Sequence, residues 1–271
     1  MPESDLSVLI KAARAAGEVA SQFDGPSAKL WHKPDEAGPV TEADLAVNDV
    51  LHEQLMQTRP QYGWLSEETE DSSARQQASH VFIIDPIDGT RSFINGDKTW
   101  AHSLAIAEQG QITAAVVFLP MLNKLYAAAH GQGASLNDAP LSASDCEDIF
   151  KAKVLTTRAN IDPKHWNGPV PDLQRHHRPS LAYRMALVAE GQFDAMLTFR
   201  DSWEWDIAAG ALLATEAGAT VTDKHGAALH FNSPKAQTKG VVSSGCKLHP
   251  QILSRLAYNS LSLAAAVVWR R

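Results

Sequence analysis

The stretch Val81-Phe82-Ile83-Ile84-Asp85-Pro86-Ile87-Asp88-Gly89-Thr90 carries the strongest structural and chemical signal in the sequence. Residues 81–84 form a continuous run of β-branched and other apolar residues, which predicts a strand buried on both faces. Asp85 and Asp88 follow it, so charge collects at the carboxyl end of a core strand, where open α/β sheets bind ligands. Pro86 has no N–H donor and is expected to end the ladder, while Gly89 permits a tight turn.

The residues after this strand are suited to hold a phosphate and a metal ion. Thr90 offers a hydroxyl and a backbone N–H at an expected helix start, which is a favourable place for a phosphate. Carboxylate oxygens are hard ligands, which suit Mg²⁺ better than zinc. The alternative is an ordinary Asp-Pro, Asp-Gly turn after a core strand.

Residue periodicity around this strand predicts alternating helices and strands. Helical spacing of apolar residues predicts helices over 5–23 and from 41 to about 58, separated by a loop or irregular hairpin. Alternating segments predict an antiparallel meander near 103–108, 112–119 and 124–129. Further helices are expected over 181–190 and 206–217, with Gly218 as the C-cap of the second. The pattern is typical of an α/β or α+β layered protein with a boundary near 130–140.

Acidic residues elsewhere are candidates for the same site. Glu67 and Glu68 follow a short strand and, pointing in opposite directions, could supply one metal ligand and one supporting group. A solvated acidic loop is the alternative. Asp206 is expected to begin a helix, where an aspartate usually acts as a cap or a dipole partner.

Asp44 also has two interpretations. It lies three residues after Thr41, which is the spacing of a capping box. It could equally orient the hydroxyl of Thr90 so that the pair polarises an attacking water, and the spacing leaves both open. The adjacent His176 and His177 lie between arginines and are expected on a solvated basic loop.

Composition excludes several classes of protein. The 271 residues include 24 Lys and Arg against 31 Asp and Glu, and the net charge of −7 argues against a nucleic-acid polymer as partner. Cys146 and Cys246 stand 100 positions apart and form neither a zinc nor a disulfide pattern, which favours a reducing cytoplasm. The acidic start is unlike a signal peptide, and the apolar run over 261–269 is too short to span a bilayer.

Three segments together resemble the inositol monophosphatase superfamily of magnesium-dependent, lithium-sensitive phosphatases. They are Pro39-Val40-Thr41-Glu42-Ala43-Asp44, then Glu67-Glu68 ahead of Asp85 to Thr90, and Trp205-Asp206 through Glu216-Ala217-Gly218. The likeness covers about residues 5–257. Weaker features are most similar to bacterial 3'(2'),5'-bisphosphate nucleotidases, which remove the 3'-phosphate of adenosine 3',5'-bisphosphate in sulfur metabolism. These features are Leu65-Ser66-Glu67-Glu68, Thr99-Trp100-Ala101 and Trp203-Glu204-Trp205-Asp206.

The resemblance implies a five-layer αβαβα sandwich in two halves. Residues 1–135 would carry most metal ligands, and residues 136–271 would carry Asp206 and the leaving-group pocket. Two or three Mg²⁺ ions would be held by Glu67, Asp85, Asp88, Asp206 and the carbonyl of Ile87. Gly89 and Thr90 would hold the phosphate, and Thr90 with Asp44 would activate water for in-line attack.

The leaving-group pocket of relatives is lined by segments that here contain Ser180, Arg184, Arg200 and Glu204. An arginine there could pair with a second phosphate, or could lie on the surface. Two departures from the family are Ser66, where a glycine is usual, and Pro179-Ser180, where a Gly-Ser or Gly-Thr pair is common.

The activity that this resemblance implies is hydrolysis of the 3'-phosphate of adenosine 3',5'-bisphosphate by metal-activated water. The alternative is an inositol-1-monophosphatase with the same catalytic site, and a non-catalytic regulatory partner is a third interpretation. Relatives include dimers and monomers, so a homodimer stays open. Weak attachment of the tail over 264–271 to the inner membrane also stays open.

Overall fold

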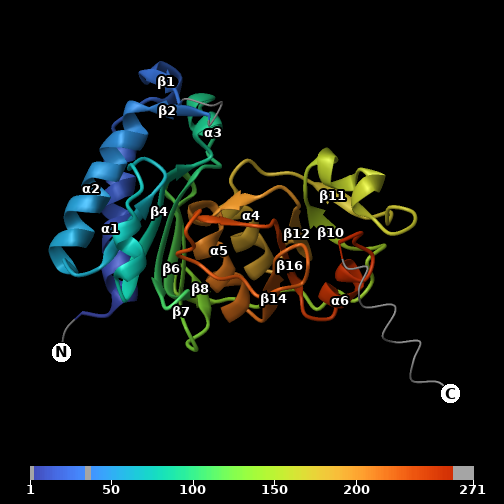
Figure 1. The fold of residues 1–271 in the computed structure, drawn as a ribbon. Coiled ribbons are helices and arrows are strands. Elements are labelled where there is room, and N and C mark those ends of the chain that lie inside the picture. The colour runs from blue at the N-terminus through green and yellow to red at the C-terminus, as the bar shows by residue number, and fades with distance from the viewer. Residues whose placement is uncertain (1–2, 34–37, 259–271) are drawn as a thin grey trace.

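The computed structural model describes residues 3–33 and 38–258, and these form a stack of five layers (Figure 1). Helices α1 (Asp5–Ala20) and α2 (Glu42–Thr58) cover one face of a seven-stranded sheet. Helices α4 (Leu181–Ala189) and α5 (Glu204–Glu216) lie between that sheet and a five-stranded sheet. The short helix α6 (His249–Leu253) packs on the far side of the second sheet. The predicted αβαβα sandwich is confirmed.

The large sheet has the strand order β3-β4-β5-β6-β7-β8-β9. Strands β3 and β4 are parallel, and every later neighbouring pair is antiparallel, which confirms the predicted meander. The bounds are β3 (Gly63–Ser66), β4 (His80–Asp88), β5 (Ala101–Glu108), β6 (Gln111–Leu119), β7 (Lys124–Ala129), β8 (Ala134–Leu136) and β9 (Ala139–Pro140).

The second sheet has the order β11-β10-β12-β16-β14. Its bounds are β10 (Lys153–Leu155), β11 (Gln174–His176), β12 (Ala195–Thr198), β14 (Ala219–Thr222) and β16 (Val241–Gly245). Two small two-stranded antiparallel sheets pair β1 (Leu30–His32) with β2 (Pro39–Thr41), and β13 (Ser202–Trp203) with β15 (Gln237–Thr238). The first sheet runs to Pro140 and the second starts at Lys153, so the division of the chain at 135/136 stays a prediction.

Strand β4 is buried on both faces, as its composition predicts. Phe82 and Ile84 pack into the cluster beneath α1 and α2, while Val81 and Ile83 pack into the cluster around α4 and α5. The strand is longer than expected, because Pro86 does not end it. The pairing with β5 shifts register between Asp85 and Asp88 and then resumes, so the missing N–H of Pro86 produces an irregularity rather than a stop.

Helix boundaries differ from the expected ones by a few residues. Helix α1 ends at Ala20 rather than 23, because the amides of Gln22 and Phe23 bond the carbonyls three residues back, of Val19 and Ala20, instead of four. Helix α5 begins at Glu204, two residues before the expected start, since the extended backbone of Trp203 caps it. Asp206 therefore lies inside the first turn. Gly218 follows the C-cap residue and has φ +91°, the left-handed conformation that favours glycine.

No helix within the two described ranges is long and apolar enough to cross a membrane. The apolar run over 261–269, and the tail over 264–271 for which membrane attachment stayed open, lie outside the described residues.

Candidate active site

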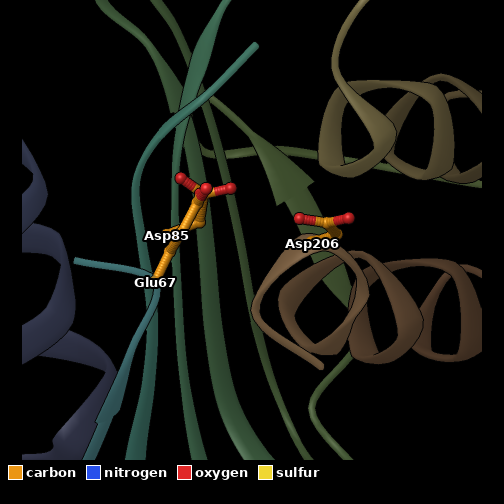
Figure 2. A group of neighbouring side chains, drawn as sticks. All are labelled: Glu67, Asp85 and Asp206. Atoms are coloured by element: carbon orange, nitrogen blue, oxygen red, sulfur yellow. The ribbon is translucent and has the colours of Figure 1, made fainter. Parts of the chain in front are cut away.

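Three carboxylates from different elements converge at one edge of the large sheet (Figure 2). Glu67 follows β3, Asp85 lies on β4 and Asp206 lies in the first turn of α5. One carboxylate oxygen from each lies within 4.8 Å of the other two. Because β3 and β4 are parallel neighbours, their carboxyl ends meet at the same edge, and α5 presents Asp206 from across the gap. The Ser103 hydroxyl donates to the carbonyl of Trp205 over 2.9 Å, which ties the start of α5 to the sheet.

The electrostatics of this cluster favour a cation. Burial raises the pKa of Asp85 well above its usual value, and the charges of Glu67 and Asp88 raise it further. Burial and the same kind of repulsion raise the pKa of Asp206. Within the described part of the chain, the buried Oδ1 atom of Asp85 has no hydrogen-bond partner. An all-oxygen donor set with an unsatisfied buried carboxylate fits a hard divalent ion such as Mg²⁺.

Asp88 lies in the same cleft but is held by helix α4. Its Oδ2 accepts hydrogen bonds from the Ser180 hydroxyl at 2.5 Å and from the amide of Ala182 at 2.7 Å. Burial outweighs these bonds and raises the pKa of Asp88 to about 6. The fully buried Ser180 also caps α4 by accepting from the amide of Tyr183. Ser180 thus contacts a predicted metal ligand and is not among the residues that line the cleft.

Asp44 makes both of the contacts that its sequence position left open. Its Oδ2 accepts from the amide of Thr41 at 2.8 Å and from the Thr41 hydroxyl at 2.5 Å, which completes a capping box at the start of α2. Its Oδ1 accepts from the Thr90 hydroxyl at 3.2 Å, and the same hydroxyl lies 3.2 Å from the carbonyl oxygen of Ile87. Burial raises the pKa of Asp44 to about 6. Gly89, with φ +99°, makes the turn that brings Thr90 to this position.

Glu67, Asp85, Asp88 and Thr90 line a cleft of about 530 Å³. Arg184, Arg200 and His177 belong to the same lining, and the two arginines form what we call its cationic wall. The buried guanidinium of Arg184 donates to the carbonyls of Arg178 and Pro179 and contacts Nε2 of His177 at 2.9 Å. Among the described residues, no carboxylate forms a salt bridge with Arg184 or Arg200. His177 is exposed, as expected for a solvated loop, and its ring also contacts Arg184.

Comparison with known proteins identifies the family. Residues 1–260 match the family described as "Inositol monophosphatase family". The chain belongs to this family. It is 36% identical over 234 residues to an inositol-1-monophosphatase of Rhizobium meliloti, which covers 82% of this chain and 86% of that protein. It is 30% identical to the 3'(2'),5'-bisphosphate nucleotidase CysQ of Salmonella typhimurium. That match covers 83% of this chain and 93% of CysQ.

Two further similarities extend the range of relatives. The chain is 34% identical to the Nus factor SuhB of Escherichia coli, with 80% of this chain and 84% of that protein covered. The solved structure of a Thermotoga maritima IMPase superposes with a TM-score of 0.80 at 27% identity, covering 92% of this chain and 95% of that one. Members of the inositol monophosphatase family are metal-dependent phosphatases that hydrolyse phosphomonoesters, and this chain is an enzyme of that class.

Lys33 is a site residue that the sequence did not reveal. Its ammonium donates to Glu67 and to Glu68, each at 2.7 Å. The expectation that the two acids point apart was wrong, because β3 ends at Ser66 and strand alternation no longer applies. Burial lowers the pKa of Lys33, but the two carboxylates more than offset this and the net shift is upward. Burial, with the Glu67 charge, raises the pKa of Glu68 to about 7.

Ser66, which replaces the usual glycine of the family, has a partner of its own. Its buried hydroxyl donates to the side-chain oxygen of Asn48 in α2 at 2.7 Å and accepts from the amide of Glu68. The substitution therefore ties the turn that carries Glu67 to helix α2.

The structure does not bring Glu204 to the lining of the cleft. Its carboxylate is buried and accepts from the amides of Asn232 at 2.6 Å and Ser233 at 2.9 Å. The buried Arg75 bonds the Asn232 side chain and the Ser233 carbonyl from the other side. A residue next to the cleft in sequence is directed away from it, because helix α5 begins at Glu204 and turns this side chain toward the 232–233 loop.

Proposed function

We propose that the enzyme removes the 3'-phosphate of adenosine 3',5'-bisphosphate with the help of Mg²⁺. The observation that carries this proposal is the buried Arg184 guanidinium, which lines the cleft with the exposed Arg200 and forms no salt bridge within the described residues. Asp88 and Asp206 attract it without a direct ion pair. A buried guanidinium of this kind is suited to a ligand that supplies the anion. The carboxylate cluster serves one phosphate through metal ions, and the arginine wall serves the second.

The similarity to CysQ supports this assignment, since that relative is a 3'(2'),5'-bisphosphate nucleotidase. The proposal includes the finer expectations that go with that activity: two or three Mg²⁺ ions, inhibition by lithium, a place in sulfur metabolism and a cytoplasmic location.

In this proposal Glu67, Asp85, Asp88, Asp206 and the carbonyl of Ile87 hold the metal ions. When bound, Mg²⁺ would neutralise the phosphate and favour charge development in the transition state. Asp44 fixes the rotamer of the Thr90 hydroxyl through its Oδ1 atom, so the lone pairs of that hydroxyl are available to a water in the cleft. Gly89 and the amide of Thr90 begin α3 (Thr90–Ile94) and contact the phosphate. Water attacks phosphorus, the bond to the 3'-oxygen breaks, and that oxygen gains a proton.

The test is phosphate release from adenosine 3',5'-bisphosphate and from inositol 1-phosphate at equal concentrations, with Mg²⁺ and with or without lithium. We expect a strong preference for the bisphosphate. Arg184→Met should lower kcat/KM for the bisphosphate more than for inositol 1-phosphate, and Arg184→Lys should retain part of the difference. A preference for inositol 1-phosphate would overturn the substrate assignment and leave the catalytic site in place.

The second candidate is an inositol-1-monophosphatase, which the 36% identity to the Rhizobium meliloti protein favours. The same assay separates the two. A non-catalytic role, favoured by the likeness to the Nus factor SuhB, would instead give binding of both compounds without turnover.

A further inference from the structure

Two tryptophans form a stacked pair on the wall of the cleft. The rings of Trp203 and Trp205 lie 4.7 Å apart between centroids and 9° from parallel, and both residues line the cleft with Asp206. Trp203 is 42% exposed, which is unusual for so large an apolar side chain beside a functional cleft. Its backbone belongs to β13, whose pairing with β15 fixes its position.

The Trp203 ring stacks on one aromatic partner and keeps part of its surface exposed to solvent. Among residues 3–33 and 38–258, Trp205 is the only ring stacked on it, and no cation lies over it. Trp203 stands three residues from Arg200, on the cationic wall, and three residues from Asp206, in the carboxylate cluster. The ring thus lines the same cleft as both of the groups to which the proposed function assigns the two phosphates.

We infer that the purine base of a nucleotide bisphosphate stacks on the Trp203 surface that Trp205 leaves uncovered. This inference rests on the proposed function and adds the residue that recognises the base. Stacking requires only an aromatic face, so the site would distinguish a nucleotide from a phosphorylated polyol more strongly than adenine from guanine. Trp205 is the support that keeps the Trp203 ring in a fixed orientation.

The test measures binding without turnover. Calorimetry with Mg²⁺ on the Thr90→Ala background, which lacks the hydroxyl proposed to activate water, compares adenosine 3',5'-bisphosphate with 1-deoxyribose 3,5-bisphosphate, which has the same phosphates and no base. Trp203→Ala should weaken binding of the nucleotide by about tenfold to hundredfold, the range for losing one base–aromatic contact. Binding of the base-free compound should stay within about twofold, and Trp203→Phe should retain most of the affinity for the nucleotide.

Phe150→Ala is the matched control, because Phe150 is an aromatic residue 58% exposed that does not line the cleft. It should leave both affinities unchanged. Equal weakening of both compounds by Trp203→Ala would overturn the inference, since it would mean damage to the phosphate sites. Unchanged binding of both would overturn it as well. Absence of phosphate release from the wild-type protein with Mg²⁺ would instead refute the proposed function. The binding comparison could still be interpreted in that case, because it does not depend on turnover.

Discussion

The Nδ1 atom of His102 lies 2.5 Å from the carbonyl oxygen of Pro86, inside the core of the protein. His102 stands on β5 between Ala101 and Ser103, the residues that pair with Asp88 and Asp85. Burial lowers the pKa of His102 to about 4, so the ring is neutral at pH 7 and Nδ1–H donates to the carbonyl. A side chain thus satisfies a backbone acceptor at the irregularity that separates two acidic residues of the site.

Replacing His102 by leucine should destabilise the protein by about 1–3 kcal/mol, because the buried Pro86 carbonyl loses its donor. Asparagine places an N–H near the position of Nδ1, so His102→Asn should recover part of that loss. Urea unfolding at pH 7.5 measures both. Equal losses for the two variants would show that the hydrogen bond contributes nothing beyond the packing of the ring.

The same histidine should make stability depend on pH. Its folded pKa of about 4 lies below the unfolded value near 6.5, so the unfolded state binds the proton first as pH falls. The stabilisation that the neutral His102 ring contributes to the folded state is fully present above pH 6.5 and is lost as the pH falls toward 4. The difference in unfolding free energy between wild type and His102→Asn, measured across this range, isolates the effect. A difference that does not shrink with acidification would contradict the assignment.

Asp85→Asn should raise the melting temperature of the metal-free protein while abolishing its response to Mg²⁺. The native pKa of Asp85 is raised, first by burial, so its charge costs stability at neutral pH when no cation offsets it. Differential scanning calorimetry with and without Mg²⁺ tests this, because a bound ion stabilises the wild type. Phosphate release should be lost in the variant. A variant that still gains stability from Mg²⁺ would remove Asp85 from the metal ligands.

Ser180→Ala should raise the Mg²⁺ concentration needed for half-maximal activity. The hydroxyl holds Asp88 at 2.5 Å, and its loss frees that carboxylate to rotate. It should also cost about 1 kcal/mol, because Ser180 is the N-cap of α4. Ser180→Thr keeps the hydroxyl and is the control. An unchanged Mg²⁺ dependence with a raised KM would instead favour the direct substrate contact expected from the sequence.

Glu204→Gln should lower stability without changing KM. One of the two amides bound to the carboxylate would lose its acceptor, at a cost of about 1–3 kcal/mol. Glu216→Gln is a matched control, because Glu216 accepts from the amides of Gly131 and Gly133 in the same manner. Both variants should unfold at lower urea concentration with unaltered kinetics. A raised KM confined to Glu204→Gln would restore this residue to the substrate pocket.

Much of the fold follows from local sequence. The apolar run over 81–84 predicted a strand buried on both faces, because every residue in it must be kept from water. Thr41 and Asp44 predicted the start of α2, because a capping box satisfies helix amides within four residues. The Asp85 to Thr90 turn also had recognisable chemistry, since its carboxylates and its glycine are consecutive in the chain.

Tertiary structure decided which distant side chains meet and which way neighbouring ones point. Asp206 joins Glu67 and Asp85 because α5 packs against the large sheet. The spacing of these residues in the sequence does not by itself predict that contact. Glu204, two residues away, turns to the 232–233 loop, while Lys33 comes to the acidic cluster. The local sequence determines which backbone conformation each segment prefers and which charged side chains it carries. Long-range packing fixes the direction of each side chain, because burial of the two sheets and their helices orients every element at once.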